Sequence, residues 1–482
     1  MTSIVKKTVM AKIYSILLLL FWGAGLSAQE IWSLEKCIDH AQKNSLVIQQ
    51  SELAISRNQI SLKQAKSDRY PNLNGSLGFF EQFGRTIDPT TNSFANKKIG
   101  SSQMAISSGV ILFNAGRINN TIAQAKLNLE AARQDAQNTS NDLSLNVALI
   151  YLQILFAEDQ VENAKSKLSI AQAQLKRTQA LIQAGSLAEN EALQFDAQVA
   201  TGEQSLITAQ NTLDNAYLQL KQLLRLENDV DIQIERPDIS TGDLNPELLT
   251  TEAIYQQALG NQPNIKAGEI RLKSSELGQK IARSQLYPSI SLSGSLSTNY
   301  STLSRKLDTE NSKIASFPQA VKINGAPATL EVPQLVPSFI DNPFKDQFNE
   351  NFGQSVGVRL SIPIYQNGRT SAAIQRAQLG ILQTKLANEQ AKQSLRSNIQ
   401  KAIADAKAAK RQYTAAQKAA KATQAVYENT QQKYAIGAAS SFELTTAKNN
   451  ADTAKTQLTG SKYDLIFKLK IIDYYQGRKI QF

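Results

Sequence analysis

The sequence of 482 residues is poor in the side chains that bind metals or act as acids, bases and nucleophiles. It has one cysteine, Cys37, and one histidine, His40, without the clustered carboxylates that would complete a zinc or copper site. A single cysteine excludes a disulfide within the chain, so we expect a buried or unreactive thiol. No phosphate-binding glycine loop, nucleophile elbow or HExxH sequence is present. We therefore predict no enzyme activity, no cofactor and no metal site.

Long hydrophobic segments are also missing, apart from one near the N-terminus. Lys6, Lys7 and Lys12 precede an apolar segment from Ile13 to Leu26, which predicts a secretory signal peptide over residues 1–28. This segment is shorter than the roughly 20 residues that a transmembrane helix needs. We expect no later segment to cross a bilayer as a helix, so a mature protein embedded in a membrane would use β-strands.

The sequence is basic overall, but its positive charges do not cluster into a patch that could bind nucleic acid. The formal net charge is +11, and removal of the three signal-peptide lysines lowers it to +8 (11 − 3 = 8). The remaining charges are scattered along the expected helix faces, which is typical of a solvated surface. We expect no nucleic-acid partner.

The main feature that is present is an internal duplication. Asn44 recurs as Asn261 and Tyr70-Pro71 as Tyr287-Pro288, each 217 positions later (261 − 44 = 217). Further along, residues recur 252 positions later (368 − 116 = 252): Gly116-Arg117 as Gly368-Arg369, Leu127 as Leu379, Gly185 as Gly437 and Glu191 as Glu443. The increase of 35 (252 − 217 = 35) places one insertion between Pro288 and Gly368. The chain therefore contains two copies of one unit.

Each copy is expected to contain a pair of β-strands. Alternating stripes mark them: Met104, Ile106, Ser108, Val110 and Leu112 in the first copy, and Val356, Val358, Leu360, Ile362 and Ile364 opposite Ile290, Leu292 and Leu296 in the second. Alternation over about ten residues is typical of a membrane β-strand, and a half-buried hairpin of a soluble protein is the alternative. The segments 81–100 and 300–351, rich in Asn, Pro, Ser and Gly, are expected to be loops between the strands.

Long helices follow the strands. Apolar or small residues recur at alternating spacings of four and three from Leu143 to Ile182, from Phe195 to Leu223 and from Leu395 to Tyr434, the pattern of a coiled coil. A helix from Arg117 to Ala184 would be about 100 Å long, whereas Ser186–Leu224 and Leu34–Arg69 would span about 58 Å and 54 Å. Two shorter helices placed end to end therefore match one long helix.

These patterns predict five segments: a signal peptide (1–28), a first structural repeat of helix, two strands, long helix and shorter helix (29–224), a linker at mid-height (225–248), a second repeat (249–476) and a C-terminal tail (477–482). Four strands are too few to close a barrel, and open sheet edges are not tolerated in lipid. A chain embedded through these strands must therefore form an oligomer.

Gly185 and Gly437 each follow a predicted long helix and mark the point where the chain reverses direction. Together, the signal peptide, the duplicated unit and these two glycine turns resemble the TolC-like outer membrane efflux proteins. The most specific similarity lies in two segments, Gln183 to Leu193 and Lys433 to Leu444. The resemblance implies a mainly α fold with a small β part: a homotrimeric α-helical barrel continuous with a 12-stranded transmembrane β-barrel, four strands per protomer. It also implies an outer-membrane location, with the helical domain in the periplasm and residues 225–248 in an equatorial belt.

The same resemblance implies a function and partners. The chain would be the exit duct of a tripartite efflux or type I secretion system, passively conducting substrates to the exterior. Its partners would be outer-membrane lipid, a periplasmic membrane-fusion adaptor and an inner-membrane pump of the resistance-nodulation-division or ATP-binding-cassette type. Gly185 and Gly437 would form the tip turns on which the adaptor docks.

Three further residues are candidates for a tip gate. Tyr434 and Glu191 match two members of a latch that closes the tip in the family, and the arginine of that latch is replaced by Ala439. Glu443 would form an acidic ring in a trimer, while a second acidic position of the family is Thr446 here. The alternatives are that both glutamates are first-turn residues favoured by the helix dipole, and that Tyr434 packs in the coiled-coil seam.

Two other functions stay open at this point. A secreted structural or adhesive coiled coil would explain the signal peptide and the heptads, but not the strands or the duplication. A periplasmic enzyme or binding domain lacks a catalytic constellation. Both alternatives predict a water-soluble protein, whereas an export duct requires detergent for extraction.

Overall fold

The computed structural model describes residues 30–87, 92–96, 98–227, 229–237 and 245–479. The predicted signal peptide and the last three residues of the tail lie outside the described residues. The chain divides into two compact units, one comprising Met1–Asn58, Asn128–Leu272 and Gln383–Phe482, and the other Gln59–Leu127 and Lys273–Leu382. No described segment tests the boundaries predicted from the repeats, which stay predictions.

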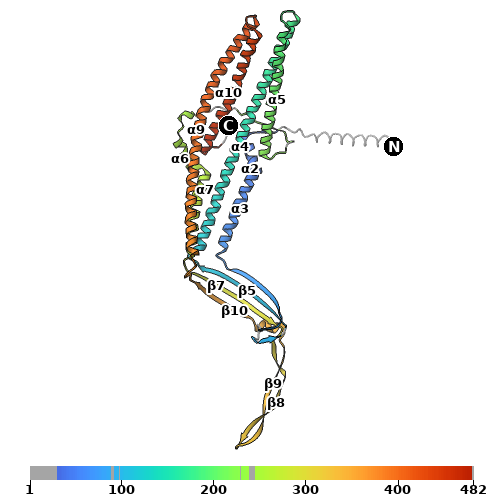
Figure 1. Ribbon diagram of the computed structural model, residues 1–482, viewed down its shortest axis with the longest axis vertical. Helices are drawn as coiled ribbons and strands as arrows, with labels where there is room; N and C mark the ends of the chain where they lie inside the picture. The colour runs from blue at the N-terminus through green and yellow to red at the C-terminus, as the bar shows by residue number, and fades with distance from the viewer. Residues whose placement is uncertain (1–29, 88–91, 97, 228, 238–244, 480–482) are drawn as a thin grey trace, which may run out of the picture. The chain divides into compact units, whose positions relative to one another are not determined.

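The first unit is built mainly of helices (Figure 1). Its strands β1 (Glu30–Trp32) and β6 (Ile232–Ile234) pair in parallel, and a short 3-10 helix, η1, covers Pro246–Leu248. Its helices, four of which also contribute residues to the second unit, are α2 (Leu34–Asn44), α3 (Leu46–Ser67), α4 (Arg117–Gln183), α5 (Asn190–Leu224), α6 (Thr251–Asn261), α7 (Pro263–Ser284), α9 (Arg369–Ala435) and α10 (Ser441–Tyr475).

The helix lengths confirm the internal duplication. Both α4 and α9 have 67 residues, both α5 and α10 have 35, both α3 and α7 have 22, and both α2 and α6 have 11. The strand-to-helix turns are also alike, since Ala115-Gly116 and Asn367-Gly368 each place two successive residues at positive φ. The long helices are therefore about 100 Å each, as the rise per residue requires.

The predicted seam residues form the core of the first unit. On α4, Val147 and Ile154 are fully buried, and Ala157, Val161, Ala164, Ala171 and Thr178 are also buried. Val147 and Ile154 belong to a hydrophobic cluster that also contains Cys37 of α2, Leu220 of α5 and Ile466 of α10. On α9 the seam is buried from Leu395 to Ala409 but only half-buried from Tyr413 onward. The period of the sequence therefore fixes which helix face is covered.

The first helix of each repeat is interrupted, contrary to the prediction of one helix from Leu34 to Arg69. Ser45 (ψ 131°) and Gln262 (ψ 120°) have extended backbones between α2 and α3 and between α6 and α7. In the second copy Pro263 explains the break, because the residue before a proline is disfavoured in the helical region. No proline marks the break in the first copy.

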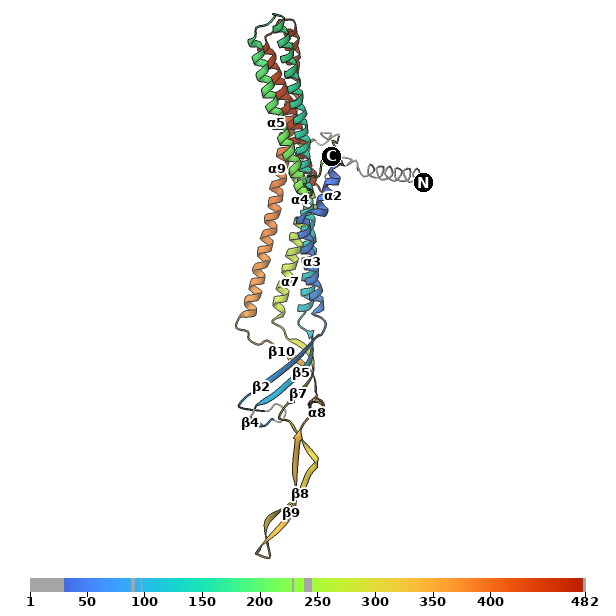
Figure 2. The same cartoon turned by 90° about the vertical axis from the view of Figure 1, so that its right-hand side faces the viewer.

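The second unit contains an antiparallel sheet in the order β10-β7-β5-β2 (Figure 2). Its strands are β2 (Asn72–Gln82), β5 (Ile99–Phe113), β7 (Ser289–Ser301) and β10 (Gly353–Ser361). β10 ends at Ser361, so Ile362 and Ile364 of the predicted stripe lie beyond the pairing. A small hairpin, β3 (Arg85–Ile87) and β4 (Phe94–Asn96), occupies the first predicted loop.

The second predicted loop, 300–351, is not a loop. It folds as a long hairpin, β8 (Arg305–Ile323) and β9 (Ala326–Asp341), followed by the short helix α8 (Phe344–Glu350). Its turn is Asn324-Gly325, with both residues at positive φ, the backbone of a two-residue hairpin turn. An Asn-Gly dipeptide favours a hairpin turn. The surrounding prolines favoured a loop instead, which is why the prediction was wrong.

One helix among the described residues, α4, is long and apolar enough to cross a membrane by length and composition. This differs from the expectation that no such segment follows the signal peptide. Within this apolar segment, 44% of the residues are buried inside the protein. Packing of the coiled-coil seam accounts for its apolar residues.

Candidate functional site: a two-faced sheet and two helical tips

The strand register separates the four-stranded sheet into two chemically different faces. Residues directly opposite each other in antiparallel strands point to the same side of the sheet. Val358 lies opposite Leu292, which in turn lies opposite Val110. The same face holds nearly all the other large apolar residues of these strands: Leu73, Leu77, Phe79, Met104, Ile106, Ile290, Leu296, Val356 and Leu360.

The other face is made mainly of small and polar side chains, with Phe80 and Ile111 as large apolar exceptions. β7 alone contributes six serines to it, and its neighbours add glycine, serine and asparagine: Ser289, Ser291, Ser293, Ser295, Ser297, Ser301, Ser107, Gly109, Ser355, Gly357, Asn72 and Asn74. The hydroxyls of Ser295 and Ser355 are 2.8 Å apart across the strands. Within the paired residues of this sheet, Arg359 is the single charged side chain on the polar face. This face therefore suits contact with water.

The apolar face is exposed within one chain. Val356, Val358 and Leu73 are 83%, 68% and 75% exposed. Contiguous exposed apolar side chains on a regular strand pattern are typical of the lipid-facing side of a membrane sheet. The edge strands β2 and β10 have no outer partner strand in the part of the chain that the structure describes. In the hydrocarbon of a membrane, further strands would have to pair with these edges and close the sheet. Strand directions alternate from β2 to β10, so β2 of a second copy can add to β10 in antiparallel fashion.

Two helical turns in the first unit contain the predicted tip glycines. Gly185 (φ +73°) follows α4, and its N–H donates to the Ile182 carbonyl at 2.8 Å while Ser186 N–H donates to Leu181 at 2.9 Å. Gly437 (φ +77°) follows α9 with the same two-bond pattern. A residue with a Cβ is disfavoured in this left-handed backbone, so glycine fixes the reversal.

The structure gives both candidate glutamates partners at the second tip. The Ser441 hydroxyl of α10 donates to Glu191 Oε2 of α5 at 2.5 Å, which joins the two tips within one chain. Glu443 forms a capping box with Ser440, accepting from its backbone N–H at 2.7 Å and donating its own N–H to the hydroxyl at 3.2 Å. The Ser440 N–H, and then its hydroxyl, lower the pKa of Glu443. The carboxylate therefore stays charged at the start of α10.

Tyr434 is half-buried on the seam of α9, one turn before Gly437. The position suits packing along the seam and places the phenol close to the tip turn. Glu191 is held by Ser441 in the single chain, and this pairing joins residues 250 positions apart. No periodicity or local motif could have indicated that pair.

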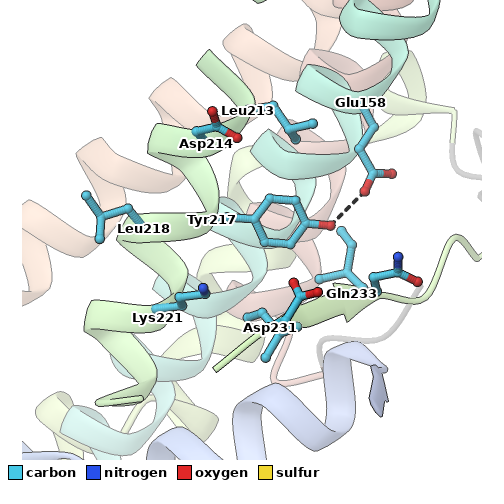
Figure 3. Close-up of a pocket in the computed structure, with 10 residues that line it drawn as sticks. Glu158, Leu213, Asp214, Tyr217, Leu218, Lys221, Asp231 and Gln233 are labelled. Atoms are coloured by element: carbon cyan, nitrogen blue, oxygen red, sulfur yellow. Dashed lines mark hydrogen bonds between the residues drawn. The ribbon is translucent and has the colours of Figure 1, made fainter. Parts of the chain in front are cut away.

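A polar pocket of about 690 Å³ lies among α4, α5 and the segment around β6 (Figure 3). In it the Tyr217 hydroxyl donates to Glu158 Oε1 at 2.8 Å. Burial, and then this hydrogen bond, raise the pKa of Tyr217. Beside it Arg236 pairs with Asp159 at 2.7 Å, and Asp159 also accepts from Tyr463 of α10 at 3.0 Å. These bonds connect α4, α5, α10 and the linker and stabilise the middle of the first unit.

Among the residues that the structure describes, no group of three or more His, Cys, Asp or Glu side chains could hold a metal ion. Cys37 is fully buried in the helical core, and burial raises the pKa of its thiol to about 12. His40 lies edge-on to the ring of Trp32, with the ring centroids 5.1 Å apart.

The sequence matches the family model for outer membrane efflux proteins over residues 37–224 and 254–468. The chain belongs to the outer membrane efflux protein family. It is 27% identical over 352 residues to outer membrane protein TolC of Escherichia coli, covering 70% of this chain and 61% of TolC. It is 20% identical over 431 residues to outer membrane efflux protein BepC of Brucella suis, covering 88% and 81%. Matches to the curated relatives span between 40% and 81% of those proteins' lengths.

Several solved structures share the fold. CusC superposes with a TM-score of 0.74 at 18% identity, covering 94% of this chain and 96% of CusC. The CmeC outer membrane channel of Campylobacter jejuni gives a TM-score of 0.70 at 17% identity, covering 92% and 85%. The predicted family and the predicted fold, helical with a small β part, are confirmed. As an outer membrane efflux protein, the chain resides in the outer membrane with its helical domain in the periplasm.

Proposed function

We propose that this protein is a passive exit duct, in which three copies close one twelve-stranded barrel and one helical tunnel. The observation that carries the proposal is the sheet itself. One face is mainly apolar and exposed, the other is rich in serine and glycine, and neither edge has a partner strand among the described residues. Closure by copies of the same sheet satisfies the edge hydrogen bonds in lipid and turns the polar face toward an aqueous lumen.

The duct requires partners to load it. A periplasmic adaptor and an inner-membrane pump, of the resistance-nodulation-division or ATP-binding-cassette type, would complete a tripartite efflux or type I secretion system. The tips at Gly185 and Gly437 are the proposed docking points. Beside Gly437, Ile436 and Phe442 are 81% and 68% exposed. Apolar side chains exposed on a helix turn favour contact with another protein.

Tyr434, Glu191 and Glu443 are proposed to narrow the tip. Glu443 brings one carboxylate per chain, held in the charged form by its capping box. Three such carboxylates would favour cations at the constriction. Glu191 would release Ser441 when the tip opens, since that bond ties the two tips of one chain together.

The alternative of a secreted adhesive coiled coil leaves the exposed apolar face of the sheet without a role. Two measurements distinguish the duct from the adhesive coiled coil: whether the protein needs detergent for extraction, and whether it conducts ions in a bilayer. The detergent-extracted protein should form discrete ion-conducting channels in planar bilayers of outer-membrane lipid. A protein that stays in the aqueous fraction and produces no channels would refute the duct.

A further inference from the structure

The hairpin β8–β9 is long and stands apart from the sheet. Its strands have 19 and 16 residues, and within the described part of the chain they pair only with each other. From Lys313 to Ile323 it extends about 35 Å at the usual rise per residue. A two-stranded hairpin alone is at best marginally stable in water and needs a further strand or a packed layer. The hairpin therefore requires a partner surface.

Its two faces differ in polarity. Beyond the irregularity between Asp308 and Lys313, the facing pairs Phe317–Val332, Val321–Ala328 and Ile323–Ala326 lie on one side, together with Leu330. The opposite side holds the pairs Ser316–Pro333, Pro318–Glu331, Ala320–Thr329 and Lys322–Pro327, and one apolar pair nearer the base, Ile314–Leu335. Leu330 is 52% exposed and Ile323 is 58% exposed. From Phe317 to the turn, the first side is thus mainly apolar and uncovered, with Gln319 as its one polar residue in this part.

The base of the hairpin is held firmly by α8. Gln347 is 1% exposed, and its side-chain amide donates to the carbonyls of Ser301 and Asn342 while its oxygen accepts from Ser301 N–H at 2.9 Å. Lys306 pairs with Asp346 of α8 at 2.7 Å. Both stems are therefore anchored to the end of β7, and the hairpin leaves the sheet in a defined direction.

The strand edges are unsuited to adding another strand. Pro318 lies in β8, and Pro327, Pro333 and Pro337 lie in β9. Proline lacks the N–H that a neighbouring strand would need, and it is confined to edges that stay unpaired. The partner is therefore expected to cover the apolar face rather than extend the sheet.

We propose that this partner is the same hairpin of the other two copies, so that three apolar faces pack against one another on the threefold axis beyond the mouth of the barrel. The inference rests on the proposed trimeric duct. A twelve-stranded barrel is roughly 24 Å across, so its axis lies about 12 Å from each strand. The hairpin is about three times longer than that distance, and closure brings three identical apolar faces to the same rim. Substrates would leave between the three stems.

Cysteine cross-linking of the full-length trimer tests this packing. Leu330→Cys places a thiol on the apolar face, and Thr329→Cys places one on the opposite face of the same strand as a matched control. The native Cys37 is buried and needs no replacement. After mild oxidation in outer-membrane lipid, Leu330→Cys should yield a disulfide-linked dimer on a non-reducing gel, and Thr329→Cys should yield monomers. Val332→Cys against Pro333→Cys is a second pair that guards against misfolding of one variant.

Native mass spectrometry of the same samples separates the possible failures. A trimer without a cross-link at either apolar position would overturn the hairpin packing and leave the duct intact; the apolar face would then serve lipid or another protein. Equal cross-linking at both faces would also overturn it, because that indicates random collision. Absence of a trimer would overturn both the packing and the proposed duct.

Discussion

Replacing Val358 by arginine tests whether the apolar face of the sheet contacts lipid. Val358 is 68% exposed within the chain and lies near the middle of β10. On the surface of a water-soluble protein, such a substitution would change the free energy of unfolding by no more than about 0.5 kcal/mol. At the midplane of a bilayer, an arginine on the lipid face of a barrel costs about 2 to 4 kcal/mol. In the proposed trimer, with three copies per barrel, the cost is about 6 to 12 kcal/mol, comparable to the stability of many folded domains.

The matched control is Ser293→Arg on the polar face. Ser293 lies between Gly109 and Gly357 in the register, so a long side chain meets small neighbours on both strands. Both variants are refolded into liposomes, and the fraction of heat-modifiable trimer and its urea midpoint are measured. Val358→Arg should lose most of its trimer, whereas Ser293→Arg should assemble and change only the conductance. Equal assembly of the two variants, or the reverse order, would refute the assignment of the faces.

Four further outcomes follow from the structure. Arg359→Gln removes the single charge from the paired polar face, so the reversal potential in a salt gradient should shift toward higher cation permeability; an unchanged potential would place Arg359 outside the lumen. Tyr434→Phe with Glu191→Gln should raise single-channel conductance, and unchanged conductance would remove their gating role. Gly437→Ala should destabilise the tip by about 1 to 2 kcal/mol because φ is +77°, seen as faster hydrogen exchange at that turn alone. Cys37, with its pKa raised to about 12, should resist iodoacetamide at pH 8 until the protein is unfolded, and equal labelling of the folded protein would contradict its burial.

The helical part of the fold could be predicted because its cause is periodic and local. The alternating spacing from Val147 to Thr178 specifies which face of α4 is covered, and the structure buries those residues. The duplication then specified equal helix lengths, which the structure reproduces in all four pairs of helices. The break at Ser45 was missed since only the second copy has a proline there, at Pro263. Transferring that break by 217 positions would have placed it correctly.

The remaining features could not be predicted for two reasons. Some depend on contacts between residues far apart in the sequence, and one had conflicting local signals. The parallel pairing of Ile31 with Gln233 and the bond between Ser441 and Glu191 leave no mark in the local sequence. The prolines of the hairpin β8–β9 argued against strands, although Asn324-Gly325 is a typical two-residue hairpin turn. The two faces of the sheet could be expected from alternation, but the serine-rich character of the polar face emerged only once the register aligned β7 with β5 and β10.

The central claim is that three copies close one barrel with the serine face inward. Electron cryomicroscopy of the protein extracted from the outer membrane, in lipid nanodiscs, measures this directly. We predict a threefold particle in which β2 of each chain pairs with β10 of the next and Ser293 lines the lumen. A particle with an open four-stranded sheet, or a closed barrel with Val358 facing the lumen, would contradict the account.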